Sequence, residues 1–161
     1  MILIGIGSNL SGGRFASPQD VCNSALEELE RQGCTIRRRS RWYESAPVPA
    51  SDQPWFVNGV VEITTTLTPA ELLARLHAIE QAFGRIRRER NEARVLDLDL
   101  LAYDDIVSDT PPVLPHPRLH ERSFVLLPLA EIAPHWRHPV TGRTVSELVA
   151  ALPRDQIARP L

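Results

Sequence analysis

The stretch VLDLDLLAYD, residues 95–104, combines the alternation of a β-strand with two acidic side chains one residue apart. Successive side chains of a strand point to opposite faces of the sheet. The leucines at the even positions therefore point to one face, which we expect to be the core. Asp97 and Asp99 point to the other face. This stretch predicts a strand with one buried face and one face that serves another purpose.

The rest of the chain supplies the partners for this strand. Strand-like segments are expected at residues 1–8, 34–48 and 55–67, and helices at 17–33 and 68–84. Ser17 and Thr68 are the expected N-caps, and each precedes a proline at the first helical position. Gly33 and Gly84 follow the last helical turns. Short helical patterns at 124–134 and 144–152 come after the acidic strand.

The order strand, helix, strand, strand, helix, strand is typical of a ferredoxin-like α+β sandwich. Its sheet is mostly antiparallel, with the helices packed on one face. We expect the second face to be free, with the ligand site on and beside the sheet. A length of 161 residues suits a single domain spanning 1–161.

Charge and composition restrict the class of partner. The net charge of −2 disfavours a general binder of nucleic acid or of a membrane surface. Without a long apolar run or a basic leader, the chain is expected to be cytoplasmic. Cys22 and Cys34 lack the CxxC spacing of zinc or redox sites, and we expect both to be packing thiols.

Asp97 and Asp99 are candidate metal ligands. Two strand residues span about 6.6 Å, and like charges roughly 7 Å apart repel by ~2 kcal/mol at an effective dielectric constant of 20. A bound cation removes that cost, and Mg²⁺ commonly combines one or two carboxylates with phosphate oxygens. The alternative is that the two carboxylates are only the solvated face of an amphipathic strand.

Five arginines crowd the ten residues before this strand: Arg85, Arg87, Arg88, Arg90 and Arg94. Guanidinium groups bind phosphate through paired hydrogen bonds. Such a run is also typical of a solvated face or a nucleic-acid patch. Together with the aspartates, it favours a polyphosphate bridged by Mg²⁺.

Two further features bear on the ligand. GIGSNL at 5–10 has only two of the three glycines of a dinucleotide fingerprint. We therefore expect Gly5 and Gly7 to permit a tight turn, and side chains to hold the phosphates. Phe56 and Asn58 share one strand face, so a flat ring could lie on the phenyl group while its edge bonds the amide. The alternative for Phe56 is an ordinary place in the core.

Six motifs in the same order resemble the 6-hydroxymethyl-7,8-dihydropterin pyrophosphokinase family, nearly from end to end. They are GSNL at 7–10, DQPWFVN at 52–58, IEQAFGRIR at 79–87, LDLDLLAY at 96–103, PHPR at 115–118 and RSFVLLPLAEIAP at 122–134. The resemblance implies a ferredoxin-like fold. It also implies transfer of pyrophosphate from ATP to a pterin alcohol in folate biosynthesis, with release of AMP.

The resemblance also implies roles for individual residues. The catalytic group would consist of Asp97, Asp99, Arg85 and Arg94, and the two aspartates would hold two Mg²⁺ ions that bridge the ATP phosphates. Further nucleotide contacts would come from His77, Glu80, Arg87, Leu100, His116 and Arg122. The pterin would lie between Phe56 and Phe124, and Asn58 would bond its edge with help from the backbone around Ser45 and Val48.

The chain departs from the family pattern in two loops and at one aromatic residue. The arginine loop usually reads RWGPR, whereas residues 91–93 are Asn, Glu and Ala here, so loop closure can differ in rate or geometry. SGGRFASP at 11–18 replaces a short Gly-Asp-Arg turn, and Phe56 stands where tyrosine is also common.

Two other functions were weighed against the pyrophosphokinase hypothesis. The first is a non-catalytic ferredoxin-like sensor of nucleotide or pterin, which the presence of both aspartates with Arg85 and Arg94 disfavours. The second is a metal-dependent module acting on RNA, which the charge and the lack of RNA-motif aromatic spacing disfavour. The expected partners are therefore ATP and the pterin alcohol, with no nucleic acid and no membrane, and the chain is expected to be a monomer.

Overall fold

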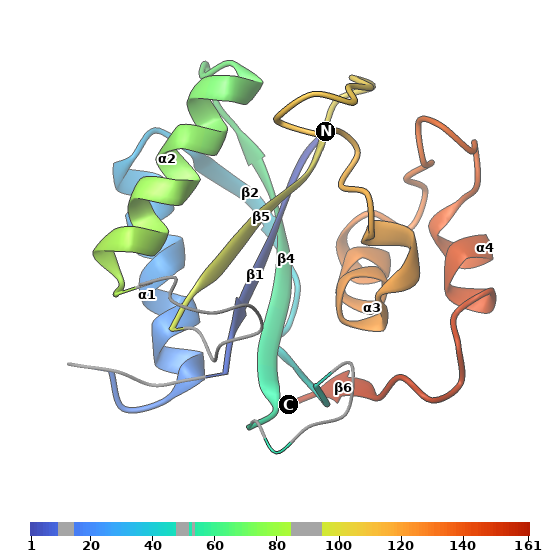
Figure 1. Ribbon diagram of the computed structural model, residues 1–161, viewed down its shortest axis with the longest axis horizontal. Coiled ribbons are helices and arrows are strands. Elements are labelled where there is room, and N and C mark those ends of the chain that lie inside the picture. The colour runs from blue at the N-terminus through green and yellow to red at the C-terminus, as the bar shows by residue number, and fades with distance from the viewer. Residues whose placement is uncertain (10–14, 48–51, 53, 85–94) are drawn as a thin grey trace.

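The chain forms a sheet with helices on both faces (Figure 1). The computed structural model describes residues 1–161 except 10–14, 48–51, 53 and 85–94. Its elements are β1 (Ile2–Ser8), α1 (Pro18–Arg31), β2 (Thr35–Arg39), β3 (Tyr43–Ser45), β4 (Phe56–Thr64), α2 (Pro69–Ala82), β5 (Asp97–Tyr103), the 3₁₀ turn η1 (Leu119–Glu121), α3 (Ser123–Ile132), α4 (Val145–Ala150) and β6 (Ala158–Pro160).

The sheet is organised around β1. This strand pairs with β4 on one side and with β5 on the other. β4 also pairs with β2 and β3, and β6 pairs with β3 at the far end. Each of these pairs is antiparallel, which confirms the predicted α+β sandwich with a mostly antiparallel sheet. Helices with the length and apolar character to cross a bilayer are absent from the described residues.

The first face of the sheet is covered by α1 and α2, as the order of strands and helices predicted, and both helices begin at the predicted caps. The Ser17 hydroxyl accepts the Asp20 N–H at 3.2 Å, and Thr68 and Glu71 form a reciprocal capping box. Apolar side chains of both helices pack against β1, β4 and β5. Cys22 is buried in this core, and burial raises its pKa to about 12. The thiol is therefore protonated at neutral pH, in keeping with the predicted packing role.

The second face is not free, contrary to the prediction. α3 packs across it, and α4 lies against α3 (Figure 1). Leu3, Val60 and Leu101 of the sheet share a second core with Leu126 and Leu129 of α3. The physical reason is that the segment FVLLPLAEI carries apolar side chains on more than one side and must be buried when it forms a helix. The N-terminal end of α3 lies beside the acidic part of β5.

The segment 34–48 forms two strands instead of the single strand predicted. Pairing of these strands with β4 is interrupted at Gly59 and Val60, and the Trp42 ring occupies the space where a side chain of residue 59 would stand. A Cβ at Gly59 would lie 2.6 Å from that ring. The Ser40 hydroxyl accepts the Val60 N–H at 3.0 Å, so this backbone donor of β4 keeps a hydrogen-bond partner at the break.

Candidate active site

The two aspartates of β5 lie on the second face of the sheet, as the alternation predicted. Leu98 and Leu100 are only 3% and 4% exposed and belong to the core under α1 and α2. Leu101 packs in the other core, on the side of α3. Asp97 and Asp99 therefore project from the α3 side, where both are half-buried, and the Asp99 side chain is 41% exposed. Neither carboxylate is sealed beneath packed side chains.

The glycines of β1 connect this acidic edge to β4. Gly7 pairs with Asp97 on one side and with Asn58 on the other, and Gly5 pairs with Asp99. The predicted tight turn at these glycines is wrong, because both lie inside a strand. Glycine has no side chain to fill the face between its neighbours. The Asn58 amide uses that space, so that a Cβ at Gly7 would lie 2.8 Å from Nδ2.

The amide of Asn58 is held by β3. The Ser45 hydroxyl donates to Asn58 Oδ1 at 2.6 Å, and both side chains are buried. With its oxygen engaged in this way, the amide presents its NH₂ group over Gly7, toward the strand that carries the aspartates. The prediction for Ser45 concerned its backbone and stays a prediction, while its side chain holds the Asn58 amide.

The start of β4 is tied to the segment that follows β1. Asn9, which is 1% exposed, donates from Nδ2 to the Pro54 carbonyl at 3.4 Å. Phe56 follows two residues later and is half-buried on the same face as Asn58. Asn9 belongs to the GSNL motif, but no local pattern predicts a role for its side chain. Its amide helps to place the strand entry that carries Phe56.

Arg122 brings the N-terminal end of α3 to the acidic strand. Its Nη1 lies 4.0 Å from Asp99 Oδ2, and its guanidinium carbon lies 5.4 Å from the centre of the Phe124 ring. Burial lowers the pKa of Arg122, but an arginine remains charged in proteins. The fold thus brings Asp99 of β5 to a cation and an aromatic ring, Arg122 and Phe124, that lie side by side at the start of α3.

His116 lies close enough to Asp99 for the carboxylate to act on its pKa. Its backbone N–H donates to the Leu101 carbonyl at 2.8 Å, which joins the segment to β5. Burial lowers the pKa of His116, while Asp99 opposes that shift. Nδ1 accepts the Arg118 N–H at 3.2 Å. The neutral ring therefore carries its proton on Nε2, which can donate to an anion.

Three of the predicted nucleotide residues lie around the edge of β5 or on its other face. Glu80 of α2 is 3% exposed and accepts the Leu98 N–H at 2.8 Å. It thereby holds the backbone between Asp97 and Asp99. His77 is exposed on α2, one turn earlier. The side chain of Leu100 is in the core, which leaves its backbone as the part that a nucleotide could contact.

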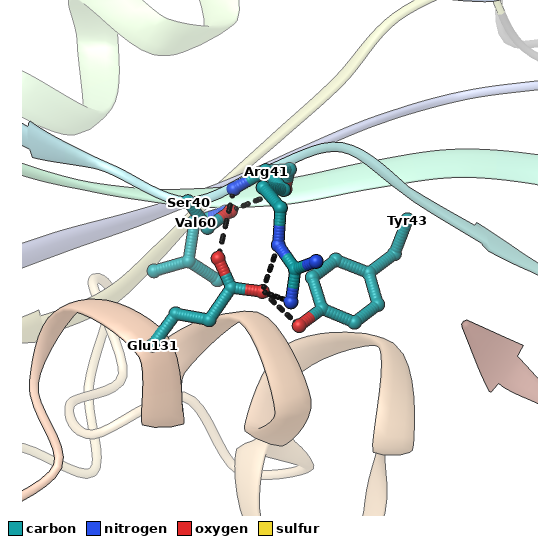
Figure 2. A network of polar contacts seen from close by, with 5 residues as sticks. All are labelled: Ser40, Arg41, Tyr43, Val60 and Glu131. Atoms are coloured by element: carbon teal, nitrogen blue, oxygen red, sulfur yellow. Dashed lines mark hydrogen bonds and ion pairs between the residues drawn. The ribbon is translucent and has the colours of Figure 1, made fainter. Parts of the chain in front are cut away.

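The far end of α3 is anchored by Glu131 (Figure 2). Its carboxylate accepts the Arg41 backbone N–H at 3.0 Å and the Arg41 Nε–H at 3.2 Å, and it also accepts the Tyr43 hydroxyl. Desolvation raises the pKa of Glu131, but these hydrogen bonds outweigh it and lower the pKa below its ordinary value. Tyr43 pairs with Asn58 in the sheet. α3 is therefore docked on the strand next to the Asn58 amide.

The described donors fit Mg²⁺. Groups of three or more metal-ligating side chains are absent from the described part of the chain, so the donor set is the carboxylate pair of β5. Mg²⁺ commonly takes one or two carboxylates and completes its shell with water and phosphate. The partly exposed oxygens of Asp97 and Asp99 suit this coordination. Four of the predicted site residues lie outside the described residues: Val48, Arg85, Arg87 and Arg94.

Comparison with known proteins identifies the family. The family model for 7,8-dihydro-6-hydroxymethylpterin-pyrophosphokinase (HPPK) matches residues 3–134. The chain is 41% identical over 160 residues to the 2-amino-4-hydroxy-6-hydroxymethyldihydropteridine pyrophosphokinase of Pseudomonas aeruginosa, covering 98% of this chain and 95% of that protein. It is 43% identical over 158 residues to the same-named protein of Methylorubrum extorquens, covering 97% and 96%.

A solved structure supports the fold. A crystal structure of Plasmodium falciparum HPPK-DHPS superposes with a TM-score of 0.72 at 15% identity. The superposition covers 92% of this chain but only 43% of the other, so the present chain spans less than half of that longer protein. The family match, the relatives and the fold agree with one another. The chain therefore belongs to the 7,8-dihydro-6-hydroxymethylpterin-pyrophosphokinase family.

Proposed function

We propose that this chain transfers pyrophosphate from ATP to the hydroxymethyl group of 6-hydroxymethyl-7,8-dihydropterin, releasing AMP, in folate biosynthesis. The observation that carries the proposal is the shared face of three strands. On that face only Gly7 stands between Asp97 and the Asn58 amide, and Asp99 follows on the same face opposite Gly5. A phosphate-binding group and a group that can read the edge of a flat ring are thus neighbours. The family membership supports the same reaction.

The pterin half of the site is built on β4 and α3. The NH₂ group of Asn58 would donate to a ring acceptor, with its orientation set by Ser45. Phe56 and Phe124 are half-buried aromatic rings that come from the sheet and from the helix that covers it. Aromatic rings stack on flat heterocycles, and the pair would fix the plane of the pterin. The hydroxymethyl group would then extend toward β5.

The phosphate half is built on β5 and the N-terminal end of α3. Asp97 and Asp99 would hold Mg²⁺, and we propose two ions. Bound Mg²⁺ would neutralise the negative charge that develops on the transferred phosphoryl oxygens. Arg122 and the Nε2–H of His116 would donate to phosphate oxygens from the helix side. Arg85 and Arg94 are proposed to act on the same phosphates.

The reaction is an in-line displacement at the β-phosphorus of ATP. The hydroxymethyl oxygen of the pterin loses its proton to solvent and forms the new P–O bond, and the bond between the β-phosphorus and the oxygen bridging it to AMP breaks, with that oxygen leaving on AMP. Such transfers depend mainly on positioning and on charge stabilisation. The proposed residues supply both, because Asn58 and the two phenyl rings orient the nucleophile while cations surround the phosphates. The chain is further proposed to act as a cytoplasmic monomer.

The proposal is tested by AMP release from ATP and the pterin alcohol, with Mg²⁺ and with excess chelator. We expect turnover with Mg²⁺ and its loss with the chelator. Asp97→Asn and Asp99→Asn should each lower kcat by about 10²–10³-fold, as is typical for removal of one electrostatic stabiliser. Asp104→Asn is the matched control, because Asp104 is exposed and pairs with the N-terminal amine.

Two outcomes would contradict the proposal. Near-normal turnover in either β5 variant would refute the metal assignment. Tight binding of both substrates without AMP release by the wild-type chain would favour the non-catalytic sensor. Circular dichroism should show that both β5 variants keep the native fold.

A further inference from the structure

The helix α3, which carries Phe124, begins without a capping residue of its own. Arg122 occupies the N-cap position of α3, and within the part of the chain that the structure describes its side chain makes no capping bond. Helices favour Ser, Thr, Asp or Asn there, because a side-chain oxygen accepts one of the unpaired N–H groups of the first turn. A guanidinium has only donors, and its charge opposes the helix dipole. Arg122 is therefore an unfavourable N-cap residue, although its position brings the guanidinium to Asp99.

The missing acceptor comes from the C-terminal segment. Oε1 of Gln156 accepts the Ser123 N–H at 2.8 Å, and Nε2 of the same side chain donates to the Glu121 carbonyl at 2.7 Å. These two backbone groups flank Arg122 on either side. One side-chain amide thus binds the peptide groups on both sides of the Arg122 Cα.

Gln156 is itself held in place by sheet pairing. The residue after it, Ile157, accepts the Ala46 N–H at 3.1 Å, and β6 then pairs with β3. The Leu161 N–H closes this pairing by donating to the Trp42 carbonyl at 3.0 Å. The Gln156 amide is therefore anchored to the strand that also orients Asn58. The other end of α3 is independently fixed by Glu131 (Figure 2).

We propose that Gln156 is a positioning residue for Arg122 in the transfer reaction. This inference rests on the proposed function, in which Arg122 donates to ATP phosphates. The two hydrogen bonds of Gln156 fix the backbone at residues 121–123, so that the guanidinium stays beside Asp99 and over Phe124. Without these bonds, the Arg122 side chain would extend from a frayed helix end. Its conformational entropy would then be lost when the nucleotide binds, and that loss would weaken binding.

The test uses Gln156→Met, which keeps much of the volume of the side chain and removes both hydrogen bonds. Nucleotide affinity is measured calorimetrically with a non-hydrolysable ATP analogue and Mg²⁺, and pterin affinity by fluorescence. We expect nucleotide affinity and kcat/KM for ATP to fall about 3- to 10-fold, the size of one to two neutral hydrogen bonds. Pterin affinity should change by less than about 2-fold, because Glu131 and the apolar core still hold α3.

The control variant lies in the same segment. Arg159→Met removes an ion pair with Glu44 and a contact with the Trp55 ring, so it loosens β6 without touching residues 121–123. It should bind nucleotide like the wild type. Equal losses in Gln156→Met and Arg159→Met would overturn the inference, because general docking of the segment would then explain both. If Gln156→Met does not fold, Gln156→Glu keeps the acceptor for the Ser123 N–H and replaces it in every comparison.

A double-mutant cycle with Arg122→Ala shows whether Gln156 acts through that arginine. Arg122→Ala alone should weaken nucleotide binding by about 10- to 100-fold, as expected for a charge-assisted bond. Gln156→Met should add less than about 2-fold in that background. An undiminished effect there would refute the inference while leaving the transfer function intact. If Arg122→Ala leaves the affinity for nucleotide unchanged, both the inference and the role of Arg122 are refuted. The turnover assay with Asp97→Asn tests the transfer reaction separately.

Discussion

Gly7→Ala offers a direct test of how the sheet shapes the pterin half of the site. The added methyl group would lie 2.8 Å from Asn58 Nδ2, closer than non-bonded contact allows. The methyl group is fixed to the central strand of the sheet, so the amide must move. Its movement would strain the 2.6 Å hydrogen bond from the Ser45 hydroxyl and turn the NH₂ group away from the ligand.

The size of the effect follows from the contacts that are lost. A ligand acceptor left without its donor in a buried site costs about 1–3 kcal/mol. At about 2 kcal/mol, the Kd for the pterin should rise roughly 30-fold. Stability should change little, because the loss of one hydrogen bond, about 1 kcal/mol, is largely offset by the smaller entropy of the unfolded chain, about 0.4–1 kcal/mol for Gly to Ala.

Gly5→Ala is the matched control for this experiment. It lies two residues away on the same strand and face, but its nearest neighbour is Leu101 Cδ1 at 3.4 Å, an ordinary packing distance. Fluorescence titration with the pterin alcohol and thermal denaturation should be run on both variants and on the wild type. Indistinguishable pterin affinity in all three proteins would refute the placement of Asn58 as the ligand-reading amide.

Two further predictions concern stability. Gly59→Ala would drive a methyl group to 2.6 Å from the rigid, buried Trp42 ring, so overpacking should cost about 2 kcal/mol and lower Tm by several degrees in a thermal melt. His138 is buried, its Nδ1 accepts two backbone N–H groups, and burial with a smaller effect of His120 lowers its pKa. The unfolded chain therefore binds more protons, so stability should fall as pH drops below the ordinary histidine pKa of 6.5. His138→Asn should flatten that decline in urea unfolding measured between pH 5 and 8, and an unaltered decline would contradict the assignment.

Local sequence patterns correctly predicted the helices that cover the first face and the separation of the acidic pair from the leucines of the same strand. Ser17 and Thr68 cap their helices through groups within three residues in the chain. The alternation in β5 separates the leucines from Asp97 and Asp99 for the same reason, because the face of a strand residue depends only on its neighbours. Such features need no knowledge of the rest of the fold.

Features that depend on distant segments were predicted wrongly or were missed. Gly5 and Gly7 were expected in a turn, because a glycine pair is a turn signal when its strand partners are unknown. Only the register of β1 between β4 and β5 shows that they clear a space for the Asn58 amide. Likewise, no local pattern connects Gln156 with Arg122.

The chain thus encodes locally which residues turn inward, where helices begin and which side chains can carry charge. Tertiary pairing decides which of those side chains meet. Gln156 reaches the backbone on either side of Arg122 across more than thirty residues, and α3 covers a face that the strand order alone left open. The physical reason is that sheet register and helix docking depend on the whole buried surface, whereas capping and alternation depend on a few consecutive residues.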